Sequence, residues 1–332
     1  MTQARDHGGG LDAAIARYGG VRADWIDLST GINPVPYPVG KIDPQAWTAL
    51  PDSGAMARLL DAARSFWNVP DGADIVAANG ASAIIARLPF LGPGQGEVHI
   101  PTPTYNEHAA AFDATRQWFT ASPDTRDTHV YVHPNNPDGR TYPADVIGGR
   151  RLTVIDESFC DVMPEASHIA LVEDQGIMVL KSFGKFWGLG GVRLGFAIGA
   201  PETLSPVTRY ADDLVEVDAT LQDHLGPWSV SGPALEIGAR ALADQAWAED
   251  TRARLVRDAD RLDALLTGAG AQIVGGTSLF RLYEVDDAAR WQEHLARHHI
   301  WSRVFPYSKT WLRLGLPHPD AWAQLADAIA GV

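Results

Sequence analysis

Short apolar runs alternate with amphipathic segments through the middle of the chain, from about residue 51 to residue 207. The apolar runs predict strands, and the segments with helical spacing predict helices. Strands that alternate with helices favour a mainly parallel sheet that is covered on both faces. The predicted helices are 55–67 and 83–88, and the predicted strands are 75–78, 97–100, 129–133, 152–155, 177–180 and 193–198.

The pattern changes after about residue 232. Residues 233–267 are rich in Ala, Leu and Arg and keep helical periodicity, which predicts one helix long enough to connect two domains. Shorter segments follow and predict a small α+β unit. Its expected strands are 272–274, 278–284, 302–305 and 311–316, and its expected helices lie near 288–298 and at the end of the chain.

The first forty residues are rich in Gly, Asn and Pro, apart from a short predicted helix at 11–18. Such a composition is typical of an irregular segment that lies across other elements. We therefore expect an N-terminal arm at 1–35 that packs with the small domain and the active site, a large domain at 36–245, and a small C-terminal domain at 246–332.

The composition is that of an ordinary globular protein, because 45% of the 332 residues are hydrophobic and 20% are charged. A net charge of −14 disfavours nonspecific binding to nucleic acid, and any phosphate-bearing ligand needs a locally basic pocket. The single cysteine, Cys160, excludes an internal disulfide or a thiolate metal cluster, and we expect it to be a small buried hydrophobe and the protein to bind no metal. The polar start of the chain and the lack of an apolar run near ~20 residues predict a cytoplasmic protein that does not span a membrane.

Two of the four lysines, Lys181 and Lys185, lie in one short segment. A predicted apolar strand ends there in Ser182, and Arg193 follows Lys185 by eight residues among glycines. A lysine that is desolvated beside another cation has a lowered pKa and can attack a carbonyl group. We therefore interpret Lys185 as a Schiff-base lysine that carries pyridoxal phosphate, with Ser182 and Arg193 at the phosphate of this cofactor.

The other polar groups of pyridoxal phosphate also have candidate partners at predicted strand ends. Asp156 follows the strand 152–155 and can keep the pyridine nitrogen protonated. Asn136 can donate to the ring hydroxyl oxygen, and Tyr105 can pack on the ring face. A helix N-terminus with small residues suits the phosphate, and it is formed by Gly80, Ala81 and Ser82. Each of these residues alone also fits a turn, a cap or the core, and their common order along the chain favours the cofactor site.

These motifs resemble those of the fold-type I, aspartate-aminotransferase-like enzymes that use pyridoxal phosphate. Residues 135–139 (Asn-Asn-Pro-Asp-Gly) are similar to their Asn-Asn-Pro-x-Gly motif, residues 156–159 to Asp-Glu-Ala-Phe/Tyr, and residues 182–195 to the lysine segment, which is specific. Arg313 lies in a stretch similar to the one whose arginine binds the substrate carboxylate. The resemblance implies an α/β, fold-type I transferase with a mainly parallel seven-stranded sheet in the large domain and a small α+β C-terminal domain.

The N-terminal arm narrows the resemblance. His7-Gly8-Gly9 and residues 27–34 are similar to signatures of the L-threonine-O-3-phosphate decarboxylase family of cobalamin biosynthesis, whose relatives include histidinol-phosphate aminotransferase. This resemblance implies decarboxylation of L-threonine O-3-phosphate to (R)-1-amino-2-propanol phosphate and CO2. The implied substrate ligands are Arg313 for the carboxylate, Arg303 for either anion, and, for the substrate phosphate, His7, Gly8, Gly9 and Asn33.

Two positions depart from the family patterns. Leu50 stands where many relatives have a tyrosine that reaches the neighbouring subunit's cofactor, and Phe159 stands where transaminases have a tyrosine that bonds to the ring oxygen. Because sites of this fold lie at a subunit interface, we expect a homodimer. Two alternatives remain open: a phospho-amino-acid aminotransferase similar to histidinol-phosphate aminotransferase, and a binding subunit for the next enzyme, cobinamide-phosphate synthase.

Overall fold

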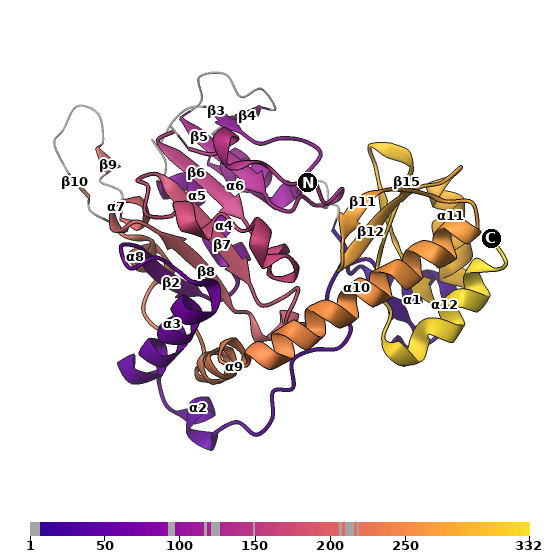
Figure 1. The fold of residues 1–332 in the computed structure, drawn as a ribbon, viewed down its shortest axis with the longest axis horizontal. Helices are drawn as coiled ribbons and strands as arrows, with labels where there is room; N and C mark the ends of the chain where they lie inside the picture. The colour runs from indigo at the N-terminus through magenta and orange to yellow at the C-terminus, as the bar shows by residue number, and fades with distance from the viewer. Residues whose placement is uncertain are drawn as a thin grey trace. The chain divides into compact units, whose positions relative to one another are not determined.

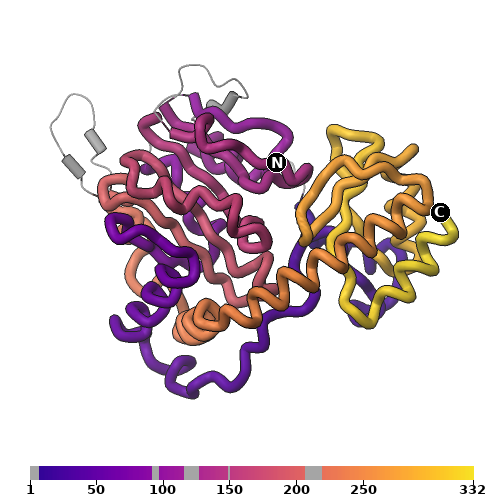
Figure 2. The backbone as a smooth tube through the Cα atoms, in the orientation of Figure 1, coloured from indigo at the N-terminus to yellow at the C-terminus, as the bar shows by residue number. Residues whose placement is uncertain are grey.

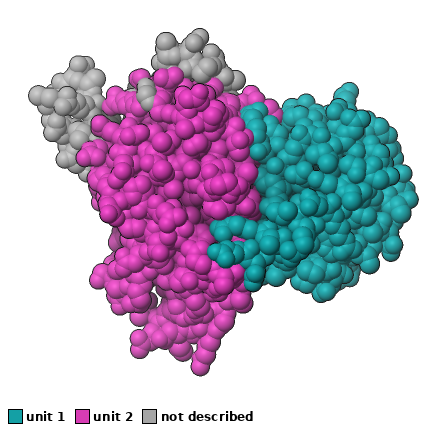
Figure 3. Space-filling view, in the orientation of Figure 1, with its two compact units in different colours: residues 1–36, 137–140, 249–332 teal, residues 37–136, 141–248 magenta. Residues whose placement is uncertain are grey.

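The computed structural model describes residues 7–91, 97–115, 118–120, 127–148, 150–205, 208–209, 216–217 and 219–332. The chain divides into two compact units, drawn in different colours in Figure 3. Unit 2 comprises Tyr37–Asn136 and Thr141–Ala248, and unit 1 comprises Met1–Pro36, Pro137–Arg140 and Glu249–Val332. Residues 1–6 of the predicted arm lie outside the described residues.

A seven-stranded sheet forms the centre of unit 2 and is flanked by helices (Figure 1). Its strand order is β2-β8-β7-β6-β5-β3-β4, and all neighbours pair in parallel except β8, which runs antiparallel to β2 and β7. The mainly parallel sheet is therefore confirmed, with one strand, β4, that the apolar pattern does not predict. The bounds are β2 Asp74–Ala78, β3 Glu97–His99, β4 Trp118–Thr120, β5 Thr128–Val132, β6 Leu152–Asp156, β7 Ile177–Ser182 and β8 Gly195–Gly199.

The helix predicted at 83–88 is wrong. The structure has α4 (Ala81–Ile85) and then α5 (Leu88–Leu91), because Pro89 has no N–H group with which to continue the helical hydrogen bonds. The predicted helix 55–67 is present as α3 (Ser53–Trp67), which the side chain of Asp52 caps. The other helices of unit 2 before α9 are α2 Pro44–Thr48, α6 Asn106–Ala114, α7 Pro201–Leu204 and α8 Leu221–Leu225, and a short pair of strands is formed by β9 Thr208–Arg209 and β10 Glu216–Val217.

The single long helix predicted over 233–267 is also wrong. Two helices, α9 (Gly232–Leu242) and α10 (Gln245–Gly268), occupy this segment. The side chain of Asp244 accepts a hydrogen bond from the backbone N–H of Trp247 (3.0 Å). An aspartate that satisfies a free N–H at a helix start favours a new N-terminus over continuation, and this explains the break.

Unit 1 is built on a four-stranded antiparallel sheet in the order β11-β12-β15-β14. The predicted α+β character of the C-terminal region is confirmed. The N-terminal segment belongs to the same unit, since its strand β1 pairs in parallel with β13, and Figure 2 shows the indigo N-terminal segment beside the yellow C-terminal elements. The bounds are α1 Leu11–Tyr18, β1 Ile26–Asp27, β11 Gln272–Thr277, β12 Phe280–Glu284, α11 Ala288–Arg297, β13 Ile300–Trp301, β14 Arg303–Phe305, β15 Ser308–Gly315 and α12 Trp322–Ile329.

A close backbone approach explains why Pro137–Arg140 belongs to unit 1. A Cβ on Gly139 would lie 2.1 Å from the carbonyl oxygen of Gly276, and a Cβ on Gly275 would lie 2.2 Å from the carbonyl oxygen of Asp138. Gly139 also has a φ of 74°, where glycine is favoured. The glycine of the Asn-Pro-x-Gly motif is therefore needed both for its backbone conformation and for contact with β11.

Within the described ranges, no helix is both long and apolar enough to cross a bilayer.

Candidate active site

The predicted cofactor residues of unit 2 gather at one edge of its sheet. Asp156 ends β6 and pairs with Leu180, while Ser182 ends β7 and pairs with Gly195 at the start of β8. Gly195 also pairs with Ala78, the last residue of β2, just before the turn into α4. Because parallel strands end at the same edge, the segments that carry Ser82, Asp156, Ser182 and Arg193 meet there, as in other open α/β sheets that bind ligands.

Asp156 lies buried at the end of β6 and is held by a residue that the sequence did not predict, His108 of α6. The His108 Nε2 atom lies 2.8 Å from Asp156 Oδ2, and Asp156 Oδ1 accepts hydrogen bonds from the N–H and the hydroxyl of Ser158. Burial by itself raises the pKa of Asp156, but the bonds and charge of His108 and the Ser158 donors outweigh it, so this pKa lies below its ordinary value. Asp156 is therefore a buried carboxylate that stays ionised, and it is not an exposed surface charge.

The signal for His108 is present in the sequence. It follows Tyr105 by three residues, so a helix that starts just after Tyr105 places both residues on one face. The rings of Tyr105 and His108 are edge to face with centroids 6.0 Å apart. Without a strand order for the sheet, nothing indicates that this face lies against the end of β6.

Asn135 ties the loop that carries Asn136 to the loop before Tyr105. Asn135 is fully buried, its Nδ2 donates to the carbonyl oxygen of Pro103 (3.0 Å), and its Oδ1 accepts from the hydroxyl of Thr104 (2.6 Å). Asn136 itself is half-buried. The first asparagine of the motif therefore connects two loops.

Arg193 forms part of a cradle with the start of α4. One guanidinium nitrogen donates to Ser82 Oγ (2.9 Å) and another to the carbonyl oxygen of Gly190 (3.1 Å). A Cβ on Gly80, whose φ is 98°, would lie 2.7 Å from the Arg193 guanidinium, and a Cβ on Gly195 would lie 2.2 Å from the nitrogen of Ala81. The two glycines thus let the Arg193 guanidinium and the start of α4 approach closely. A guanidinium, a serine hydroxyl and backbone N–H groups at a helix start form a donor set that suits a phosphate.

Lys181 and Lys185 have different environments. Lys181 is buried, and its Nζ lies 2.6 Å from Glu157 Oε2 and 3.6 Å from Asp161 Oδ1. Burial lowers its pKa, but the two carboxylates outweigh burial and raise the pKa above its ordinary value, so Lys181 stays charged. Lys185 is half-buried and its Nζ lies 5.0 Å from the ring centroid of Phe159. The two carboxylates therefore keep Lys181 protonated and disfavour it as a nucleophile, which leaves Lys185 as the candidate in this segment.

Cys160 is a free, buried cysteine, and burial raises the pKa of its thiol far above the ordinary value. It therefore behaves as a hydrophobe, as predicted. Within the described part of the chain, His, Cys, Asp and Glu residues form no group suited to hold a metal ion.

In unit 1, two arginines stand opposite each other on neighbouring strands. Arg303 of β14 pairs with Arg313 of β15 in the antiparallel register. Arg313 is buried, donates to the carbonyl oxygen of Ser29 (2.5 Å), and lies over the ring of Phe280. Because like charges directly opposite each other destabilise a sheet, this pair favours a site that is built for an anion.

The N-terminal residues of the predicted substrate site pack in the same unit. The N–H of Gly9 donates to Ser29 Oγ (2.7 Å), and a Cβ on Gly8 would lie 2.4 Å from the carbonyl oxygen of Ser29. His7 is exposed. Asn33 is buried, and its Oδ1 accepts hydrogen bonds from Arg254 (2.6 Å) and from the N–H of Val35 (3.1 Å). Ser29 thus contacts both the glycine segment and Arg313, and Arg254 is a further cation beside Asn33 that the sequence did not indicate.

The donor set fits pyridoxal phosphate. Three polar groups of the cofactor have a candidate partner of the right kind at the sheet edge of unit 2: a hydroxyl and a guanidinium for the phosphate, an ionised buried carboxylate for the pyridine nitrogen, and the Lys185 amine for the aldehyde.

Comparison with known proteins shows the family of the chain. Residues 128–329 match the family described as Aminotransferase class I and II. The chain belongs to this family. It is 39% identical to a threonine-phosphate decarboxylase from Sinorhizobium sp and 37% identical to one from Pseudomonas aeruginosa, in each case over 98% of this chain and 97% of the relative. A histidinol-phosphate aminotransferase from Desulfitobacterium hafniense is more distant, at 24% identity over 93% of this chain and 92% of the relative.

Solved structures share the fold. Histidinol-phosphate aminotransferase from Clostridium acetobutylicum covers 92% of this chain and 98% of its own, with a TM-score of 0.78 and 18% identity. The enzyme from Sinorhizobium meliloti, solved in complex with pyridoxal-5'-phosphate, covers 97% and 95% with a TM-score of 0.74 and 15% identity. L-threonine-O-3-phosphate decarboxylase from Porphyromonas gingivalis covers 92% and 98% with a TM-score of 0.66 and 16% identity. At these identities the structures support the fold, and the predicted fold class and family resemblance are confirmed.

Proposed function

We propose that this protein is a pyridoxal-phosphate-dependent decarboxylase that converts L-threonine O-3-phosphate to (R)-1-amino-2-propanol phosphate and CO2. The amino-propanol phosphate supplies the linker of the cobalamin nucleotide loop. The similarity to two threonine-phosphate decarboxylases over 98% of the chain supports this activity. The observation that carries it is the Arg303–Arg313 pair of unit 1, since two facing cations suit a substrate with two anionic groups.

We assign the cofactor to unit 2. The phosphate group would be held by Ser82, Ser182, Arg193 and the N–H groups of residues 80–82. Asp156, kept ionised by His108 and Ser158, would hold the proton on the pyridine nitrogen. Asn136 would donate to the ring hydroxyl oxygen, and Tyr105 would pack on the ring.

When bound, the cofactor supplies an electron sink for the bond at Cα that stands perpendicular to its ring. The side chains decide which bond that is. Arg313 would hold the substrate carboxylate in a fixed orientation, because a guanidinium binds a carboxylate with two hydrogen bonds. His7, Gly8, Gly9 and Asn33 would hold the substrate phosphate, with Arg303 near either anion. The amine of Lys185 would then return a proton to Cα.

The test is the release of CO2 from L-threonine phosphate and from free threonine. A charge-assisted hydrogen bond contributes roughly 1.5–3 kcal/mol, so the loss of two or three bonds to phosphate should lower kcat/KM for free threonine by several orders of magnitude. Arg313→Ala should damage turnover of both substrates, whereas His7→Ala should reduce only the preference for the phosphorylated one.

The same reaction mixtures test the alternatives. Faster turnover of histidinol phosphate with 2-oxoglutarate than of threonine phosphate would replace the decarboxylase by an aminotransferase. Absence of both activities, together with stable binding of cobinamide-phosphate synthase, would favour the binding subunit.

We also propose a homodimer in the cytoplasm. Unit 2 has a groove of about 450 Å³ that is lined in part by Leu50, Pro51, Arg58 and Glu236. Leu50 is 68% exposed, and so is nearby Trp47. Large apolar side chains exposed together next to charges of both signs are typical of a self-complementary interface. With Leu50 in place of the tyrosine of many relatives, this contact would be apolar.

A further inference from the structure

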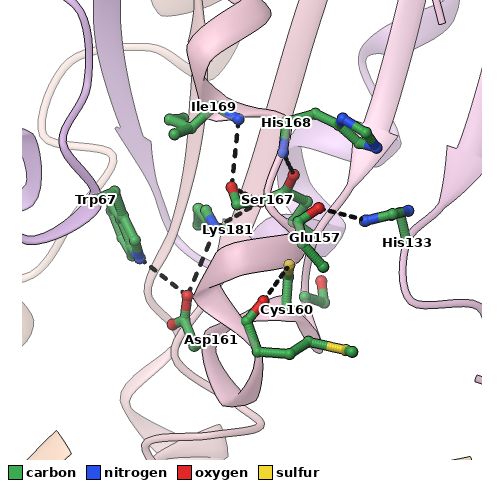
Figure 4. A network of polar contacts seen from close by, with 12 residues as sticks. Trp67, His133, Glu157, Cys160, Asp161, Ser167, His168, Ile169 and Lys181 are labelled. Atoms are coloured by element: carbon green, nitrogen blue, oxygen red, sulfur yellow. Dashed lines mark hydrogen bonds and ion pairs between the residues drawn. The ribbon is translucent and has the colours of Figure 1, made fainter. Parts of the chain in front are cut away.

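A buried ion pair lies behind the sheet edge that carries the candidate cofactor residues (Figure 4). Lys181 and Glu157 are 2% and 1% exposed. Side chains alternate along a strand, so Lys181 points to the opposite face from Ser182, and Glu157 follows Asp156 in the same way. The pair therefore connects the ends of β6 and β7 from the face that is turned away from Asp156 and Ser182.

Glu157 also holds a segment that begins ten residues further along the chain. Its Oε2 accepts a hydrogen bond from the hydroxyl of Ser167 (2.6 Å), and its Oε1 accepts one from the N–H of His168 (2.6 Å). Burial raises the pKa of Glu157, but the charge of Lys181 and these donors outweigh burial and lower it. The carboxylate therefore stays ionised and uses both oxygens to hold Lys181 and residues 167–168.

Residues 166–168 in turn hold both ends of the loop that carries Asn136. At the start of this loop, His133 Nε2 lies 2.8 Å from the carbonyl oxygen of Ala166, and at its far end His168 Nε2 lies 2.8 Å from the carbonyl oxygen of Tyr142. The N–H of Tyr142 donates to His133 Nδ1 (3.1 Å), so the two ends are also joined to each other. Since His133 Nδ1 accepts this bond, Nε2 carries the proton that is donated to Ala166.

We infer that Glu157 is a positioning residue that fixes the loop carrying Asn136 relative to Asp156 and to the lysine segment. This inference rests on the proposed function for the roles of Asn136 and Asp156. A buried ion pair is commonly no more stabilising than apolar residues of the same shape, so its presence here favours a geometric role over a purely stabilising one. The three parts of the site follow three different strands: Asn136 follows β5, Asp156 ends β6, and the lysine segment continues β7. Glu157 is next to Asp156 in the chain, pairs with Lys181 of β7, and holds the loop of Asn136 through residues 167–168.

Ser167→Ala tests the inference with a small change that touches no candidate cofactor residue. It removes the hydrogen bond to Glu157 and the longer one that Ser167 Oγ accepts from the N–H of Ile169 (3.3 Å). We expect amide hydrogen exchange of His133 and Tyr142, followed by mass spectrometry of the cofactor-free protein, to become about fivefold faster, as expected for the loss of the hydrogen bond to Glu157. In the loaded enzyme, kcat for threonine phosphate should fall about tenfold with KM unchanged, because small misplacements are costly in catalysis.

The matched control is Thr203→Val. The Thr203 hydroxyl accepts a buried hydrogen bond from the N–H of Gly176 (2.8 Å), just before the opposite end of β7. This variant should lose similar thermal stability without any change in exchange at His133 or Tyr142 and without a change in kcat. Equal effects of the two variants, or wild-type exchange and kcat in Ser167→Ala, would overturn the inference.

A double variant, Glu157→Gln with Lys181→Met, removes both charges of the pair. The buried carboxylate that remains, Asp161, keeps its hydrogen bonds from the indole N–H groups of Trp67 and Trp187. We expect a folded protein with fast exchange at His133 and Tyr142, and kcat lowered about 10-fold to 100-fold. A folded double variant with wild-type exchange and turnover would show that Glu157 does not position the loop. Amide hydrogen exchange does not depend on the reaction. If the wild-type protein shows no decarboxylase activity, the proposed function is contradicted, but the exchange at His133 and Tyr142 still tests whether Glu157 positions the loop.

Discussion

Replacing Asp156 by asparagine tests binding of the cofactor separately from protonation of its pyridine nitrogen. Asparagine keeps an oxygen that can accept both Ser158 donors, which lie 3.0 and 2.5 Å from Asp156 Oδ1. Its NH2 group would face His108 Nε2, which can accept in the other neutral tautomer of the imidazole. The phosphate cradle of Ser82 and Arg193 is unchanged. We therefore expect Asp156→Asn to fold and to bind pyridoxal phosphate.

The expected loss of activity follows from the loss of one buried negative charge. An opposite charge within about 4–6 Å shifts a pKa by about 1–3 units, and one unit corresponds to about 1.4 kcal/mol. Without the carboxylate, the proton on the pyridine nitrogen is destabilised by about 1.4–4 kcal/mol, so kcat should fall about 10-fold to 1000-fold.

The assay is CO2 release from saturating threonine phosphate, with the affinity for pyridoxal phosphate measured separately by fluorescence titration. Asp244→Asn is a suitable control, because Asp244 is another partly buried carboxylate of unit 2 that accepts a backbone hydrogen bond. The control should keep its turnover. Near wild-type turnover of Asp156→Asn with the cofactor bound would refute the assignment of Asp156 as the partner of the pyridine nitrogen.

Three further predictions concern the lysine, the pH dependence and the assembly. Borohydride reduction of the loaded enzyme followed by peptide mapping should place the pyridoxyl mass on Lys185, and a mass on Lys181 would contradict the site. Burial lowers the pKa of His133 from its ordinary value of 6.5, so the unfolded state binds this proton more tightly and the free energy of unfolding should decrease as pH falls below 6.5. His133→Gln should flatten that slope in urea titrations at pH 5.5 and 7.5, whereas equal slopes would exclude His133 as the cause. Sedimentation should find a dimer that Trp47→Asp with Leu50→Asp converts to monomer, and an active wild-type monomer would rule the interface out.

The sequence was sufficient to predict the fold class because the alternation of strands and helices is local. Each strand predicted for unit 2 has a counterpart in the structure, whereas β4 (Trp118–Thr120) is too short to stand out. The break between α9 and α10 depends on one capping residue, Asp244, in a segment whose periodicity continues on both sides. Periodicity cannot show such a break, because the helical pattern on either side is intact.

The sequence predicts those residues of the candidate site that the chemistry of the cofactor requires at strand ends. It does not predict the residues that hold them in place through contacts inside the fold. Lys185, Asp156 and Arg193 stand at strand ends, which a strand prediction already locates. His108 and the Lys181–Glu157 pair could not be predicted, because their partners are fixed by the strand order and by the face of each side chain. Asn33 shows the same limit: the resemblance implies a ligand of the substrate phosphate, but its side-chain oxygen accepts a hydrogen bond from Arg254 within unit 1.

The two lysines of one segment show how the fold assigns chemistry to identical side chains. Lys181 lies within β7 and points to the face on which Glu157 and Asp161 lie. Its ammonium is therefore held by two carboxylates, and its pKa is raised. A lysine in that state cannot attack a carbonyl, because its lone pair is occupied by a proton. Lys185 lies beyond the end of the strand, beside the ring of Phe159, where the alternation no longer directs it to that face. Only three residues thus stand between Lys181, which we infer helps to fix the site, and Lys185, which we expect to react in it. The end of β7 at Ser182 divides the two roles.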